Sequence, residues 1–548
     1  MLTITPVSAN EKVFLTGEVI PLPVPLYLFE GGSVHVQINI AATEEYRDVA
    51  LRVQSRGAFA RPKWRRVGLV PAALDAQPGY DDYYTLREDH LYPDVLENFD
   101  SHHIHGHAGH NQTFFLTLDD TPDLSAGEHM VTVRVCEGRK IIARCGFCVI
   151  KIAAPLPAQK CIVTTWMHYD SFVHQHHVRL FTRDFYRLFA SYLAAARIGG
   201  QNMILVPLFT PAFDTQIGGE RATAQLLDIA EPESGRFTFD FARLSRFIDF
   251  VRDAGMRYLE MPPLFTQWGA KNAPKILVRD ARGRLIRRFG WKTDALSDEY
   301  RSFLTQLLTA LTAFLREKGV EEDTFFHVSD EPTLEQYDQY MACKNFMLPL
   351  IGRSRTLDAC SHLEFAGKTP REYSVCIVNA VDNYVRAGVR PLCTYYCCGP
   401  INGHYTNRFL SMPLPRVSVL GLQLYAHDMD LFLHWGFNFY NSYLSRRPIV
   451  PCNNTDADGM FTAGDAFIVY PDYAGFGANP SLRLFAMGEG MRLSRALYLY
   501  ESLVGREAAL SFLAEEGISG FQTYPTGKSW LDRLTDRLCR RIMAHLPR

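Results

Sequence analysis

Two adjacent carboxylates, Asp330 and Glu331, end an apolar run and stand directly before Pro332. Aromatic and β-branched residues before such a stop are typical of a short buried strand with an exposed end. Proline interrupts regular pairing there. Two acids at one strand end repel each other, and burial of either favours its protonated form. The pair could therefore supply one proton donor and one persistent anion, while the alternative is that Asp330 caps a following helix.

The elements that would position this pair alternate between strand and helix. From about residue 160, apolar strands alternate with amphipathic helices, which predicts a (β/α)8 TIM barrel, since eight such units need about 250 residues or more. A doubly wound sheet is the rival fold, but no Gly-rich phosphate turn follows the first strand. The predicted strands are residues 161–166, 203–209, 258–261, 325–328, 356–359, 376–380, 392–396 and 438–440.

The ends of the chain have different patterns from this central part. Residues 1–155 contain short alternating runs separated by turn-forming residues, which predicts an antiparallel β-sandwich. Residues 160–480 form the predicted catalytic barrel, and residues 481–548 read as a helical segment that packs on it. The predicted fold is therefore multidomain, β followed by α/β.

The composition excludes several classes of partner. The chain has 548 residues and a net charge of −2 without a long block of one sign, so neither nucleic acid nor membrane is expected as a partner. The first residues lack the features of a signal peptide. The 12 cysteines are scattered through apolar segments, which fits reduced thiols and predicts a cytoplasmic protein. Homo-oligomerisation stays open.

Aromatic and short polar residues recur at the predicted strand ends, where barrel enzymes place their chemistry. Rings stack on the apolar face of a sugar, and Asp, Asn and His bond its hydroxyls, so this mixture predicts a sugar site. The candidate substrate-binding residues are Trp166, His168, Asp170, Gln267, Trp268, Tyr395, Tyr396, Trp435 and Asn438.

Two histidine clusters do not support a metal site. His102, His103, His105, His107 and His110 precede a predicted sandwich strand, without the acid or cysteine spacing of a closed site. A second group at residues 174–177 reads as loop surface. We therefore expect no metal and no cofactor.

Several motifs resemble glycoside hydrolase family 123. They are residues 166–170 (Trp-Met-His-Tyr-Asp), 264–271 (Leu-Phe-Thr-Gln-Trp-Gly-Ala-Lys), 329–332 (Ser-Asp-Glu-Pro), 435–438 (Trp-Gly-Phe-Asn) and 464–471 (Gly-Asp-Ala-Phe-Ile-Val-Tyr-Pro). The resemblance implies a β-sandwich followed by a (β/α)8 barrel and β-N-acetylgalactosaminidase activity. One departure lies in Met487-Gly488-Glu489-Gly490, where the family pattern leads us to expect an arginine before Glu-Gly.

The resemblance also implies a retaining, substrate-assisted mechanism. Asp330 would orient the 2-acetamido group, whose oxygen attacks the anomeric carbon, and Glu331 would act as general acid and then base. Tyr395, Tyr396 and Trp435 would wall the acetamido pocket. A small oligosaccharide, cleaved by exo action, is the expected substrate.

Two rival functions remain at this point. A conventional retaining glycosidase would use Glu331 as acid/base and a second carboxylate as nucleophile, for which Glu364 is the nearest candidate. A barrel that binds a glycan without cleaving it is the other reading.

Overall fold

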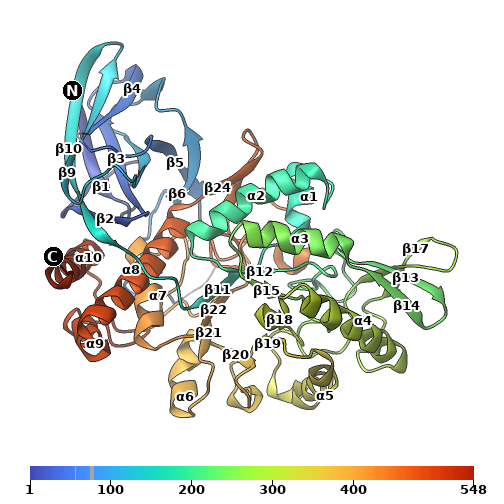
Figure 1. Ribbon diagram of the computed structural model, residues 1–548. Coiled ribbons are helices and arrows are strands. Elements are labelled where there is room, and N and C mark those ends of the chain that lie inside the picture. The colour runs from blue at the N-terminus through green and yellow to red at the C-terminus, as the bar shows by residue number, and fades with distance from the viewer. Residues whose placement is uncertain (56, 74–78, 548) are drawn as a thin grey trace.

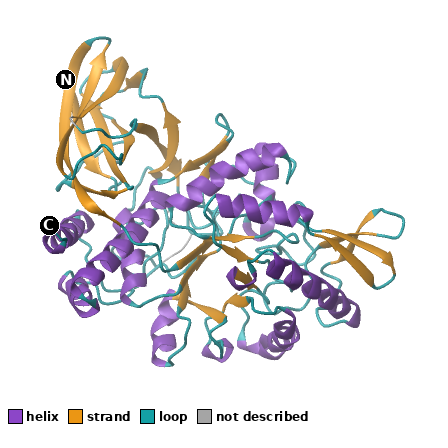
Figure 2. Ribbon diagram, viewed as in Figure 1, coloured by secondary structure: helices purple, strands orange, loops and turns teal. Residues whose placement is uncertain are grey.

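A computed structural model describes residues 1–55, 57–73 and 79–547 of the chain. A β-rich N-terminal region is followed by an α/β domain, and the last helices lie beside both parts (Figures 1 and 2). No described helix is both long enough and apolar enough to cross a lipid bilayer.

The N-terminal region contains two five-stranded sheets that share one apolar core, to which β3 contributes Val36 and Ile38 and β9 contributes Val133. Alternate residues of each strand therefore face the opposite sheet. Among the strands described in this region, β2 and β10 alone pair in parallel, where the sequence predicted antiparallel strands throughout. The first sheet has the order β1 (Leu2–Ser8), β3 (Ser33–Ala42), β8 (Asn111–Asp119), β5 (Lys63–Pro71) and β6 (Leu91–Phe99), and the second β2 (Leu26–Glu30), β10 (Lys140–Pro155), β9 (Gly127–Glu137), β4 (Tyr46–Ser55) and β7 (Ile104–Gly106).

Eight parallel strands form one nearly closed sheet in the α/β domain, an arrangement consistent with a TIM-like fold. The two end strands of this sheet, β11 and β12, are linked through Asn202. Its backbone N–H donates to the Val163 carbonyl (3.1 Å), and its side chain accepts from the Val163 N–H (2.8 Å). The strands are β11 (Ile162–Thr165), β12 (Met203–Leu205), β15 (Tyr258–Glu260), β18 (Thr324–Phe326), β19 (Arg355–Ala359), β20 (Glu372–Ile377), β21 (Cys393–Tyr395) and β22 (Leu431–His434).

Helices surround this sheet in Figure 1, and the connection between β19 and β20 departs from the regular pattern. The described residues there form only a 3-10 turn, Leu363–Phe365. The helices are α1 (Asp170–His176), α2 (Arg183–Ile198), α3 (Ala242–Asp253), α4 (Asp298–Glu317), α5 (Tyr337–Met347), α6 (Val381–Arg386), α7 (Leu414–Ala426), α8 (Leu482–Val504), α9 (Arg506–Glu515) and α10 (Trp530–His545).

Smaller sheets lie in the segments that connect these strands and helices. One has the order β14 (Arg236–Asp240), β13 (Asp228–Glu233), β16 (Ile276–Arg279) and β17 (Leu285–Phe289), and another pairs β23 (Val469–Asp472) with β24 (Gly477–Pro480). Further 3-10 turns lie at Glu321–Asp323, Leu334–Gln336, Leu348–Leu350, Val378–Ala380 and Tyr443–Ser445.

The predicted eighth strand at residues 438–440 is wrong. The eighth strand is β22, Leu431–His434, whose four residues are all buried. Residues 438–440 follow it as a loop that makes a single bridge, from Asn438 to Phe467. A strand that is buried on both faces needs a continuous apolar run, and Leu431-Phe432-Leu433 is such a run.

Glycines on α8 explain the departure at residues 487–490. A Cβ on Gly488 would lie 2.1 Å from the Ile198 carbonyl oxygen, and one on Gly490 would lie 2.3 Å from the Ser418 carbonyl oxygen. Neither position can hold an arginine because neighbouring backbone occupies the space. Arg492 instead pairs with Glu489 one turn earlier (2.6 Å).

A fully buried ion pair joins the N-terminal region to α8. The guanidinium of Arg483 donates to the carboxylate of Asp94 on β6 (2.9 Å), and neither side chain is exposed. Arg483 also donates to the carbonyls of Arg408 (2.9 Å) and Phe467 (3.1 Å). One side chain thus holds three segments together. The predicted division at residues 155/160 and 480/481 stays a prediction.

We expect Arg483→Met to lower the free energy of unfolding by about 3–5 kcal/mol, because it leaves a buried carboxylate without its cation. Urea titration monitored by circular dichroism measures the change. Arg540→Met is the control, since Arg540 is exposed and pairs with Asp536 on its own helix (3.0 Å). Equal effects of the two substitutions would contradict this role for Arg483.

Candidate active site

A pocket of about 190 Å³ opens at the carboxyl ends of the parallel strands. Trp166 follows β11, Tyr395 ends β21 and Trp435 follows β22, so strands far apart in the sequence supply one wall each. The lining residues are Trp166, Phe213, Asp214, Gln267, Trp268, Asp330, Glu331, Ala359, Tyr395, Cys397, Cys398, Leu433, Trp435, Tyr443 and Phe461. Seven of the eleven predicted site residues are among them.

The two carboxylates differ in exposure. Asp330 is half-buried, whereas Glu331 is exposed and its Oε1 accepts from the Tyr395 hydroxyl (2.6 Å). Burial, followed by the charge of Glu331, raises the pKa of Asp330 well above its usual range. Glu331 has a backbone φ of 42°, a left-handed conformation that is uncommon for a residue other than glycine. The proline after it and the contact with Tyr395 fix its direction.

A strained loop lies against this dipeptide. Trp268, Gly269 and Ala270 have φ values of 57°, 106° and 54°. The Trp268 N–H donates to the Asp330 carbonyl (3.0 Å), and the Gln336 side chain donates to the Trp268 carbonyl (3.0 Å). With 38% of its surface exposed, Trp268 forms the rim of the pocket.

A buried histidine between two carboxylates lies below the pair. His327 Nε2 contacts Glu260 Oε1 at 2.6 Å, and its Nδ1 contacts Asp358 Oδ1 at 3.4 Å. Burial opposes protonation, but the bonds to Asp358 and Glu260 prevail and raise the pKa of His327 to about 9. The imidazole is therefore a cation at neutral pH. Its charge favours the anionic form of Asp330, against the raising causes above.

The same network fixes an aromatic wall. Trp166 Nε1 donates to Glu260 Oε1 (2.6 Å), and the Trp166 ring stacks on Phe213 with centroids 3.9 Å apart. On another wall, Trp435 Nε1 donates to Asp465 Oδ2 (3.0 Å), where burial raises the pKa of Asp465 to about 7. Polar atoms of both tryptophans are thus held from outside the pocket, which leaves their rings to face it.

Four predicted binding residues do not line the pocket. His168 donates from Nε2 to the Trp435 carbonyl (2.8 Å) and accepts from Arg221 at Nδ1 (3.0 Å), and Arg221 also pairs with Asp170. Asn438 bonds the backbone of His168 in both directions (2.7 and 3.2 Å). These bonds brace the pocket wall from behind, and the hydroxyl-binding role of His168, Asp170 and Asn438 stays a prediction.

Tyr396 is the fourth such residue. Successive residues at a strand end point to opposite sides, so Tyr395 enters the pocket while Tyr396 points away from it. Tyr396 is fully buried and packs on Phe432 and His434, with ring centroids at 4.9 and 5.3 Å.

Sequence reasoning did not predict eight of the pocket residues, which are Phe213, Asp214, Ala359, Cys397, Cys398, Leu433, Tyr443 and Phe461. Phe213 and Asp214 lie in the loop after β12, while Tyr443 and Phe461 come from the long segment after β22. Loops without periodicity carry little signal for this placement. Asp214 has a pKa raised by burial to about 6, and its carboxylate accepts from the Leu444 N–H (2.9 Å).

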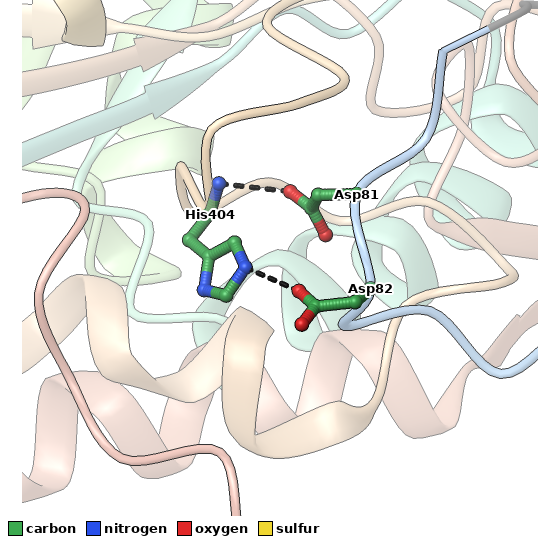
Figure 3. A group of neighbouring side chains, drawn as sticks. All are labelled: Asp81, Asp82 and His404. Atoms are coloured by element: carbon green, nitrogen blue, oxygen red, sulfur yellow. Dashed lines mark hydrogen bonds and ion pairs between the residues drawn. The ribbon is translucent and has the colours of Figure 1, made fainter.

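Among the described residues, one group of side chains lies close enough together to hold a metal ion: Asp81, Asp82 and His404 (Figure 3). Its atoms already have protein partners. Both oxygens of Asp81 accept from Arg416 (2.8 Å each), and His404 Nε2 contacts Asp82 Oδ1 at 2.5 Å. These contacts attach the N-terminal region to α7, which carries Arg416, and to the loop before α7, which carries His404. Two of the histidines near residue 105 contact acids instead: His103 contacts Asp48 (2.7 Å) and His107 contacts Glu45 (3.4 Å).

Comparison with known proteins identifies the family. The model of the glycoside hydrolase 123 catalytic domain matches residues 166–500, more than half of the chain. No curated protein matches. A family 123 glycoside hydrolase from Clostridium perfringens, whose structure was analysed for glycolipid glycan hydrolysis, has a TM-score of 0.69 at 14% identity and covers 99% of this chain and 98% of its own.

A second solved structure is much less similar. A GH5 xyloglucanase from Bacteroides ovatus has a TM-score of 0.31 at 9% identity, and covers 85% of this chain and 98% of its own. The pocket with its adjacent carboxylates lies inside the segment that the family model matches. The chain therefore belongs to glycoside hydrolase family 123.

Proposed function

We propose that this protein is an exo-acting retaining glycosidase that removes a terminal β-linked N-acetylgalactosamine, or a related 2-acetamido sugar. The observation that carries the proposal is the Asp330–Glu331 pair in a pocket walled by aromatic rings. With about 190 Å³, the pocket is smaller than the ~300–1,000 Å³ of typical ligand sites, which suits one sugar ring.

The proposed reaction is substrate-assisted. Asp330 accepts the acetamide N–H, and the acetamide oxygen attacks the anomeric carbon as an intramolecular nucleophile. Glu331 protonates the leaving oxygen and then takes a proton from water, which opens the oxazolinium intermediate with net retention. Tyr395 holds Glu331 in position through the 2.6 Å contact.

Charge balance suggests how a bound substrate affects Asp330. Burial and the charge of Glu331 favour the protonated form of Asp330. An acetamide N–H donated to Asp330 favours its anion, as does the charge of His327. Substrate binding would therefore favour the Asp330 carboxylate that the proposed reaction needs.

The conventional retaining mechanism has less support. Glu364 is exposed in the 3-10 turn after β19 and is absent from the pocket lining. Asp214 is a further carboxylate in the pocket, so it becomes the candidate nucleophile for this rival. We assign it instead to binding a sugar hydroxyl.

The two carboxylates are expected to respond differently to substitution. Asp330→Asn lowers kcat on nitrophenyl β-N-acetylgalactosaminide about 10²–10³-fold, because the developing charge loses its anion. Glu331→Gln costs about 10²–10⁴-fold on a disaccharide and less on the nitrophenyl glycoside, whose leaving group needs little protonation. Glu335→Gln, exposed one turn later, is the control. Near-normal activity of Asp330→Asn would exclude substrate assistance.

The substitution Asp214→Asn distinguishes a hydroxyl-binding role of Asp214 from a role as nucleophile. If the Asp214 anion binds a hydroxyl, KM of the wild type rises as pH falls below 6, the substituted enzyme keeps most of kcat, and its KM is raised at every pH. Steady-state kinetics from pH 4.5 to 8 test this. A loss of kcat that azide restores would instead identify Asp214 as a nucleophile.

The raised pKa of His327 predicts that the stability of the fold depends on pH. Its pKa is raised from 6.5 to about 9, so the stabilisation is complete below pH 6.5 and is lost as pH rises through 9. The free energy of unfolding should fall by up to about 3 kcal/mol over this range. Urea titrations at pH 6, 7.5 and 9 test it, with ¹⁵N-histidine NMR for the pKa. Glu260→Gln should lower that pKa, and an unchanged value would refute the network.

A further inference from the structure

A second hollow, the β5–α8 groove, lies between the outer face of the first N-terminal sheet and helix α8. Its volume is about 370 Å³, and it shares no residue with the candidate active site. The strands β3, β8 and β5 supply its floor, because alternate residues of each strand point away from the sandwich core. Its lining includes Phe29, His35, Lys63, Arg65, Asp119, Phe485, Glu489, Arg492 and Arg495.

Cations outnumber carboxylates in this groove, four to two. Lys63 pairs with Asp119 (2.6 Å), and Arg492 pairs with Glu489 through two bonds of 2.6 Å. Arg495 donates to backbone carbonyls of the linker, including that of Leu156 (3.0 Å). Among the described residues, no carboxylate forms an ion pair with Arg65, on which the charge of Asp119 acts only from farther away.

Arg65 has an unusual environment for a cation. Its guanidinium lies 5.6 Å from the centre of the Phe485 ring, and no described residue accepts a hydrogen bond from it. Its Nε is buried without an acceptor among the described residues. Burial lowers the pKa of Arg65. Arg492, by contrast, has Glu489 and the Cys539 thiol as partners. A buried N–H group without an acceptor is costly, so Arg65 points to an absent acceptor.

We propose that the β5–α8 groove binds a small ligand that carries an oxyanion, through the free guanidinium N–H groups of Arg65. A planar guanidinium fork matches carboxylate, sulfate and phosphate oxygens. The rings of Phe29, His35 and Phe485 offer an apolar surface to the rest of the ligand, which favours an acidic sugar over a bare ion.

Calorimetric titration of the full chain with sodium sulfate, sodium phosphate, sodium glucuronate and neutral glucose tests the site, at constant ionic strength. We expect binding of the anions, with glucuronate tightest, and none of glucose. Arg65→Gln should weaken anion binding at least tenfold. Arg66→Gln is the matched control, since the next residue of β5 is exposed and pairs with Glu97 (2.6 Å); it should bind as the wild type does. Sulfate or phosphate binding equal to that of glucuronate would mean that the oxyanion alone is recognised.

Two results would overturn the proposal: no heat of binding with any anion, or equal affinity in the wild type and Arg65→Gln. Circular dichroism and hydrolysis of the nitrophenyl glycoside show whether Arg65→Gln is folded, and both should be unchanged. If Arg65→Gln fails to fold, Arg65→Lys keeps the charge without the fork and should still lose binding. Because calorimetry measures anion binding without hydrolysis, the groove can fail while the proposed glycosidase function stands.

Discussion

The candidate active site depends on a cation enclosed by the parallel sheet. His327 is buried between Glu260 and Asp358. Its positive charge offsets the charges of two carboxylates that would otherwise be buried together without a cation. A buried ion pair that loses one partner is strongly destabilising, so the three groups form a unit. Asp330 stands at the edge of this unit, and its charge state follows from the balance among them.

The same unit orders the pocket above it. Glu260 holds the indole of Trp166, and Asp358 accepts from the backbone N–H groups of Val328 and Ser329, which lead directly into Asp330. Side chains locked by such outer contacts lose little entropy when a sugar binds. A wall of rings with satisfied polar atoms suits a sugar ring, and the few remaining polar groups can decide its orientation.

Outside the sheet, buried arginines attach the N-terminal region to the α/β domain. Arg483 bonds Asp94, and Arg416 bonds Asp81, each at a distance of several hundred residues along the chain. Arg65 in the β5–α8 groove differs from these because no described carboxylate pairs with it directly. That contrast, more than the charge itself, marks the groove as a place where a ligand completes the structure.

The sequence by itself determined the alternation of strands and helices, the Asp330–Glu331 pair and the aromatic residues at the strand ends, because hydrophobic period and proline stops are local signals. The family resemblance followed from motifs, and the match over residues 166–500 confirms it. Only the tertiary structure decided which polar side chains reach the pocket. His168 and Asn438 satisfy each other and the Trp435 loop, Tyr396 points away by strand alternation, and Asp214 arrives from a loop without periodicity. Direction and partner of a polar side chain depend on residues distant in sequence, which no local pattern specifies.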